Sequence, residues 1–213
     1  MREGINAFIR EYLRENLGIY MVVGFIFTAG VLGGVLVLRY MQPGAIGEMA
    51  DHFALFVRGL EEGREVDYGS VFRASIGQNF RHLALVCLAG VFANGFPLIF
   101  LLVGMRGVAI GFTVAFLIEK ASVGGALFSL AAVAPHNMIV IPVFLIVAAT
   151  GFAFSWRRFR AIYIEKRPRP FGEDLFSYGR TIVCLGLALI IGSLVETYVS
   201  MLFMRLAATA FLG

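Results

Sequence analysis

The sequence predicts an all-α fold, namely a polytopic membrane helix bundle of about five transmembrane helices with interfacial amphipathic helices. Apolar residues make up 59% of the 213 positions and charged residues only 15%, against roughly 25% charged in globular proteins. Long uncharged runs alternate with short polar segments, a pattern typical of chains that cross a bilayer several times. Apolar residues inside the polar segments recur at three- and four-residue steps, as in amphipathic helices. We therefore expect residues 1–213 to form a single membrane domain.

Residues 1–18 are predicted to form a cytoplasmic amphipathic helix that leads into the first span. Its apolar side chains share one helical face and are Ile5, Phe8, Ile9, Tyr12 and Leu13. Span one, residues 19–38, is twenty residues long, whereas the apolar core of a signal peptide has about 7–15. We therefore interpret it as an uncleaved anchor.

Residues 39–82 form the longest polar segment, which we expect on the outer side of the membrane. A first helical pattern within it comprises Ile46, Met49, Ala50, Phe53, Phe56, Val57 and Leu60. A second pattern runs directly into the second span and comprises Val71, Phe72, Ser75, Ile76, Asn79 and Phe80. So short a segment, without a disulfide pair, makes a poor independent domain. We expect amphipathic helices that lie on the bilayer or on a partner.

The second and third spans are predicted from a run that contains one arginine. Span two covers residues 83–105, with a kink at Asn94-Gly95-Phe96-Pro97. Arg106 then marks a cytoplasmic turn, because a long cationic side chain at a span end extends to the interface. Residues 107–118 form span three, although a twelve-residue helix is only about 18 Å long, against a hydrocarbon core of ~30 Å.

The region after span three allows two topologies. Residues 121–155 carry no charge, are too numerous for one simple span, and are broken at Pro135. If this run crosses the membrane once, the chain has five spans, the last at residues 181–204. If residues 107–118 instead form a re-entrant hairpin with the beginning of the run, the chain has four.

The positive-inside rule, by which Lys and Arg gather in cytoplasmic loops, favours five spans. In the five-span topology, eleven of the eighteen Lys and Arg residues lie on the cytoplasmic side with the N-terminus. Seven of them belong to a basic loop at residues 156–180. The four-span topology would place that loop outside. We therefore predict a cytoplasmic N-terminus and an outer C-terminus.

Polar residues inside the predicted spans are candidates for a membrane-interior site, and they are Asn94, His136, Asn137 and Glu196. An ionisable residue within a span is costly and is by default a functional candidate. Glu196 either serves as a proton or cation site or pairs with a polar neighbour. Two prolines, Pro135 and Pro142, free backbone carbonyls in the longest apolar run. His136 and Asn137 either satisfy these carbonyls or line a polar cavity, as in the broken helices of transporters.

Enzymatic and metal-binding functions find no support in the sequence. Motifs such as H-E-x-x-H, G-x-S-x-G and the P-loop do not occur. The three histidines have no ligand spacing, both cysteines lie inside apolar runs, and no basic stripe suggests nucleic-acid binding. We expect no catalytic residue, no metal and no cofactor. Gly30-xxx-Gly34 and Gly107-xxx-Gly111 predict close helix packing, within one chain or between the copies of a homodimer.

Three motifs follow the N-terminal helix and the first span in a characteristic order. They are Phe72-x-x-Ser75-x-x-x-Asn79, the stretch Arg106-Gly107-Val108-Ala109-Ile110-Gly111-Phe112-Thr113-Val114, and Pro135-His136-Asn137 with Pro142. This order resembles the stage II sporulation protein M family over essentially the whole chain. Many members of the wider family carry an acid four residues after the histidine of the proline motif, where this sequence has Val140. That departure weakens a proton-coupled or catalytic role for His136.

The resemblance implies a non-catalytic membrane component of the engulfment machinery in endospore-forming bacteria. In that family, the protein holds two peptidoglycan-remodelling enzymes, one of them an amidase, at the septal membrane as the mother cell engulfs the forespore. We expect the outer segment 39–82 to be the docking surface, with contacts from Phe53, Phe56, Leu60 and Phe72. The alternative is that these apolar faces only lie on membrane lipids. A rival function is a transporter or permease-like subunit with a polar site at the broken span around Pro135.

Overall fold

The structure is a computed structural model. The part of the chain that it describes is built from helices throughout. That part is the backbone of residues 2–61, 67–166, 171–200 and 202, without the side chains at 2–16, 56–57, 60–61, 120–136, 171, 173–174, 177, 196 and 200. The helices are α1 (Arg2–Tyr40), α2 (Pro43–Glu61), α3 (Tyr68–Val91), α4 (Phe96–Phe159), the π-helical segment η1 (Arg160–Ile164), α5 (Phe171–Leu194) and the π-helical segment η2 (Val195–Ser200).

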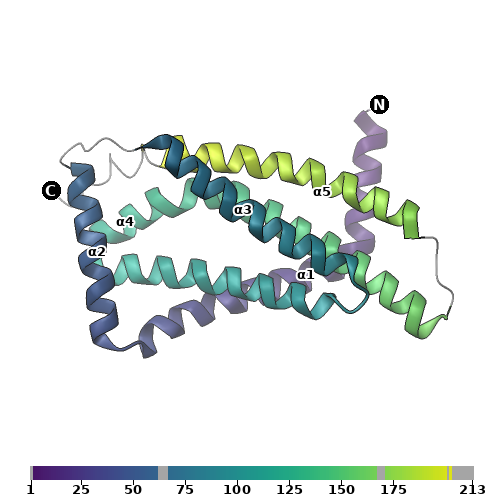
Figure 1. The fold of residues 1–213 in the computed structure, drawn as a ribbon, viewed down its shortest axis with the longest axis horizontal. Helices are drawn as coiled ribbons and strands as arrows, with labels where there is room; N and C mark the ends of the chain where they lie inside the picture. The colour runs from purple at the N-terminus through teal and green to yellow at the C-terminus, as the bar shows by residue number, and fades with distance from the viewer. Residues whose placement is uncertain (1, 62–66, 167–170, 201, 203–213) are drawn as a thin grey trace.

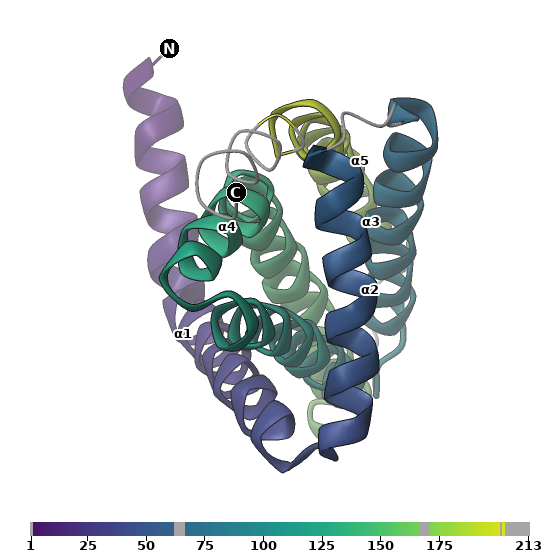
Figure 2. The same ribbon diagram turned by 90° about the vertical axis from the view of Figure 1, so that its left-hand side faces the viewer.

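Helices α1, α3 and α5 and the two halves of α4 form long rods that run side by side (Figure 1), and we call these the five rods. Helix α2 lies across one end of these rods in both views (Figures 1 and 2), and we call this the α2 end. The opposite end, where residues 92–95 connect α3 to α4, is the turn end. The first part of α1 projects from the turn end (Figure 1), so the chain enters the bundle there.

Helix α4 reverses its direction between Glu119 and Asn137, although helical backbone continues through this stretch. A straight helix of its 64 residues would be roughly 96 Å long. Instead, the rings of Phe96 and Trp156 lie 5.4 Å apart, and those of Phe100 and Phe152 lie 4.9 Å apart. The two halves are therefore antiparallel neighbours. The segment that contains Pro135 is the place where the chain turns back at the α2 end.

The connection between α3 and α4 is a complete break rather than the predicted kink. The helix ends at Val91, and the next begins at Phe96 with a proline in its first turn. A Cβ on Gly95 would overlap the carbonyl oxygen of Ala89, so the chain can fold back this tightly only with glycine there. The predicted boundaries of spans two and three were therefore wrong. The turn expected at Arg106 occurs eleven or more residues earlier, at residues 92–95, and Arg106 lies inside α4.

Four helical segments are long and apolar enough to cross a membrane, and they are Leu17–Tyr40, Phe96–Glu119, Asn137–Ile164 and Tyr178–Val199. The fifth rod, α3, has 24 residues, enough to span, but is less apolar because it carries several polar side chains. It nevertheless packs against both α4 and α5. The prediction of an all-helical membrane bundle with about five spans is confirmed, and the protein is a membrane protein.

Helices α1 and α4 pack together more extensively than any other pair of helices described. Glycines form the contact between α1 and the first half of α4. A Cβ on Gly30 would overlap the carbonyl of Gly104, and one on Gly34 would lie 2.6 Å from the amide nitrogen of Phe112. From the other side, Cβ atoms on Gly107 and Gly111 would overlap the carbonyls of Phe27 and Val31. The two helices therefore approach backbone to backbone within one chain, as small residues permit in lipid.

Aromatic residues gather at the turn end, where the halves of α4 begin and finish. The ring of Trp156 lies 5.6 Å from that of Phe159, which lies 5.0 Å from that of Tyr163. Trp and Tyr favour the level of lipid headgroups. Arg157 and Arg160 are exposed beside them. This combination marks the turn end as one membrane–water interface.

Candidate functional site

A buried polar cluster joins three rods in the interior of the bundle. The side-chain amide of Asn79 on α3 donates to the hydroxyl of Ser193 on α5 at 3.0 Å. Its oxygen accepts a hydrogen bond from Nη2 of Arg106 on α4 at 3.4 Å. Asn79 is 4% exposed, Arg106 is 8% exposed and Ser193 is fully buried. The cluster therefore connects α3, α4 and α5 away from water.

The charge of this cluster belongs to Arg106, which stands near the middle of the candidate span Phe96–Glu119. Its guanidinium lies 6.0 Å from the ring centroid of Phe144, on the returning half of α4, within the range of a cation–π contact. The ring of His82 meets the same Phe144 edge to face at 6.4 Å. An intramembrane arginine is costly and is retained where it faces polar groups inside a bundle.

The chemistry that this cluster offers is a fixed positive charge with hydrogen bonds rather than proton transfer. A guanidinium keeps its proton in proteins, and the hydroxyl of Thr197 beside the cluster donates to the carbonyl of Ser193 at 2.9 Å. The described side chains include no group of three metal-ligating residues. The arrangement therefore fixes the relative positions of three rods, as polar contacts between helices do in lipid.

The predicted membrane-interior residues do not converge on this cluster. Asn94 is exposed in the connection at the turn end, whereas Asn137 is half-buried where α4 returns from the α2 end. The two therefore lie at opposite ends of the rods. The side chains of His136 and Glu196 lie outside the described residues, as does that of Pro135. Two mainly apolar grooves, one along α5 with Arg180 in its lining and one between α1 and α4 with Arg39 and Glu119 in its lining, do not include Arg106.

Helix α2 is attached to the α2 end of the bundle by one apolar stripe. Ile46, Met49, Ala50 and Phe53 pack around Leu38, Phe116 and Leu117. The ring of Phe53 meets that of Phe116 edge to face at 6.2 Å. Phe53 was predicted to contact a partner, but its ring faces the bundle. The spacing placed it correctly on the apolar face of α2, and that face is occupied by this chain.

The opposite face of α2 is exposed and chemically mixed. Leu55 is 65% exposed, and the side chains of Asp51, His52 and Arg58 are exposed around it. Phe72, on α3, is half-buried. Phe56 and Leu60, the other predicted contacts, lie outside the residues whose side chains are described. The surface available to a partner on α2 therefore centres on Leu55, which the helical spacing alone did not single out.

One feature of the sequence indicates the buried cluster, although we interpreted it as a turn at Arg106. Arg106 is the only charged residue between His82 and Glu119, and an isolated charge inside so long an apolar run must find polar partners. Asn79 lies 27 positions before it, and Ser193 lies 114 positions after Asn79. Only the folded arrangement brings the three together.

Comparison with protein families agrees with this architecture. The family model described as stage II sporulation protein M matches residues 23–201, which include α1 from residue 23 onward, α2 and the other four rods. No curated protein and no solved structure matches the chain. The match covers far more than half of the sequence, and the helical membrane bundle is present over the same residues. The chain therefore belongs to the stage II sporulation protein M family, and it is a sporulation membrane protein.

Proposed function

We propose that this protein is a non-catalytic membrane scaffold. It recruits and anchors peptidoglycan hydrolases, an amidase and a second peptidoglycan-remodelling enzyme, at the septal membrane for forespore engulfment during endospore formation. Membership of the sporulation family supports this role.

The observation that carries the proposal is the position of α2. It lies across the end of a rigid bundle, is held by its inner apolar stripe, and leaves the face around Leu55 open. An exposed leucine among charged side chains is suited to a partner contact with a small apolar centre and a polar rim. A surface held on a rigid support loses little entropy when a partner binds.

The orientation expected from the basic residues supports the same role. Seven Lys and Arg residues lie between positions 157 and 180, in and around the connection at the turn end. By the positive-inside rule, that end faces the cytoplasm. The α2 end then faces the space where the cell wall is remodelled, so α2 is positioned to meet enzymes that act there.

Replacement of Leu55 tests the proposal. The full-length protein, carrying Leu55→Asp, is expressed in sporulating cells, and the membranes are extracted for co-purification and identification of bound proteins. We expect the wild type to recover a cell-wall amidase and the variant to lose most of it, because a buried carboxylate disfavours the contact. Unchanged recovery of the amidase would show that the face of α2 around Leu55 is not part of the docking surface.

A matched control separates loss of docking from damage to the protein. Ile164 is 60% exposed at the turn end, so Ile164→Asp makes a similar change on the other side of the bundle. We expect this variant to retain the amidase. Recovery of a nucleotide-binding subunit in place of the amidase would favour the permease alternative and contradict the scaffold.

A further inference from the structure

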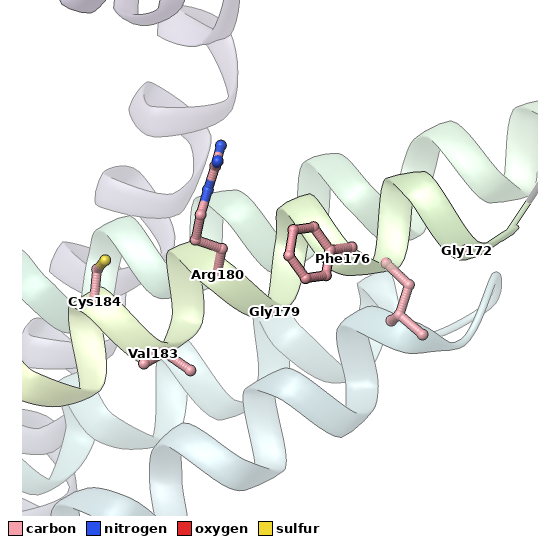
Figure 3. Close-up of a pocket in the computed structure, with 7 residues that line it drawn as sticks. Gly172, Phe176, Gly179, Arg180, Val183 and Cys184 are labelled. Atoms are coloured by element: carbon pink, nitrogen blue, oxygen red, sulfur yellow. The ribbon is translucent and has the colours of Figure 1, made fainter.

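A groove of about 650 Å³ runs along the outward side of the first half of α5. Its lining comes entirely from this helix and comprises Gly172, Leu175, Phe176, Gly179, Arg180, Val183 and Cys184. Figure 3 shows Gly179 between Phe176 and Val183 along the helix, with the side chains of Arg180 and Cys184 extending to the same side of it. Phe176 and Val183 are strongly exposed. The groove is therefore open to the membrane and is not filled by another helix that the structure describes.

The glycines of the groove pack against no other part of the chain that the structure describes. A Cβ on Gly179 or Gly172 would meet no atom within 4 Å. By contrast, the glycines between α1 and α4 are surrounded by backbone. Glycine weakens the interior of a helix relative to alanine, so Gly179 carries a cost with no gain from the described contacts. The open space matches a slender molecule lying against the helix.

Charge identifies the kind of molecule. Arg180 is exposed and forms no ion pair with any residue in the described part of the chain. The apolar part of this rod begins at Tyr178, so Arg180 stands at the level where the span enters the membrane. Trp156 and Tyr163 mark the same interface at the turn end. A cation at headgroup level above an apolar groove complements an anionic phosphate above an acyl chain.

We propose that the groove binds one anionic phospholipid. Its phosphate pairs with Arg180, and one acyl chain lies over Gly179 and along Val183 and Cys184 toward the membrane interior. This ligand is distinct from the peptidoglycan enzymes of the scaffold function, and it lies on a different helix from α2. The lipid site and the scaffold function can therefore be tested independently of each other.

Native mass spectrometry of the full-length protein from nanodiscs tests the site. The nanodiscs contain equal amounts of phosphatidylglycerol and phosphatidylcholine with the same acyl chains. We expect the wild type to retain one phosphatidylglycerol in preference to phosphatidylcholine. Arg180→Gln should lower this preference about fivefold, the factor that corresponds to one surface cation on an anionic lipid. Gly179→Leu, which fills the groove where the Cβ has room, should reduce retention of both lipids.

Two variants serve as controls at the same membrane level. Arg157→Gln removes an exposed cation at the turn end, and Gly18→Leu fills open space at the start of span one. Both should retain phosphatidylglycerol as the wild type does. Equal retention of the two lipids by the wild type would overturn the anionic site. Undiminished retention of both lipids by Gly179→Leu would show that the groove is not the lipid-binding site.

The natural Cys184 reports on the main competing occupant, a second copy of this chain. The thiol lines the groove and is exposed, so two copies packed through α5 would bring their Cys184 residues together. We expect no Cys184 disulfide dimer on mild oxidation in membranes. Efficient formation of that dimer, lost in Cys184→Ser, would replace the lipid by a homodimer interface.

Discussion

The amide of Asn79 on α3 donates to the hydroxyl of Ser193 on α5 over 3.0 Å inside the bundle. The same side chain accepts from Arg106 on α4. A single asparagine therefore links three rods whose outer surfaces are covered with apolar side chains. In lipid, such rods gain little from the hydrophobic effect against one another, so polar contacts and close packing determine how they fit.

Replacement of Asn79 by leucine should destabilise the protein. The substitution removes one acceptor from Arg106 and leaves the hydroxyl of fully buried Ser193 without its donor. We expect the free energy of unfolding to fall by about 1–3 kcal/mol, measured by thermal unfolding in mild detergent. The exposed neighbour Gln78 provides the control, because Gln78→Leu should change the free energy of unfolding by no more than about 0.5 kcal/mol.

A double-mutant cycle then tests whether Asn79 and Arg106 act as a unit. Asn79→Leu and Arg106→Leu should each destabilise the protein, and together they should cost less than the sum of the single effects, by about 0.5–3 kcal/mol. Strict additivity would show that the 3.4 Å contact contributes nothing to stability.

Two adjacent glycines on α1 should respond oppositely to alanine. A Cβ on Gly34 would overlap backbone atoms of Val108 and approach the amide of Phe112, whereas one on Gly33 would lie at an ordinary 3.7 Å from Val108 Cγ2. We expect Gly34→Ala to cost about 1–3 kcal/mol through overpacking. Gly33→Ala should leave stability unchanged or raise it by up to about 1 kcal/mol through helix propensity. Unfolding in increasing dodecyl sulfate compares them, and equal responses would contradict the described packing.

The turn between α3 and α4 should depend on Ser155. Its fully buried hydroxyl donates to the carbonyl of Phe92 at 2.7 Å and lies 3.2 Å from that of Ala93. Ser155→Ala takes the hydroxyl donor away from both carbonyls, of which that of Phe92 still accepts from the amide of Gly95 at 3.0 Å, and it should cost about 1–3 kcal/mol. Thr150→Val removes a hydroxyl that donates only to the carbonyl four residues earlier, so its cost should be below about 1 kcal/mol. Thermal unfolding ranks the pair, and the reverse order would refute this role of Ser155.

Cysteine labelling from each side of the membrane tests the orientation. In a background with Cys87→Ala and Cys184→Ser, we introduce Lys166→Cys beyond η1 and His52→Cys on the exposed face of α2. An impermeant maleimide added to intact cells should label position 52 and spare position 166 until the membrane is opened. Labelling of position 166 in intact cells would invert the topology and place α2 in the cytoplasm.

Much of the architecture could be predicted from local patterns. Apolar runs of about 20 residues identify spans because each must cross a fixed hydrocarbon thickness. The apolar face of α2 followed from spacing, and Phe53 does lie on it. The boundaries of spans two and three could not be predicted in this way. In the sequence, an arginine at a turn and an arginine buried among polar side chains both appear as a single charge in an apolar run. Arg106 was therefore predicted to lie at a turn, whereas it lies inside α4.

The sequence by itself determined the membrane class and the helical fold, because both depend on composition and short-range spacing. It also indicated glycines for close packing, at Gly30 and Gly34. Only the tertiary structure decided that those glycines meet α4 of the same chain, that Phe53 faces Phe116, and that Asn79 joins Arg106 to Ser193. These are contacts between residues far apart in the chain. Their partners are set by how rods reverse and pack, which no local pattern encodes.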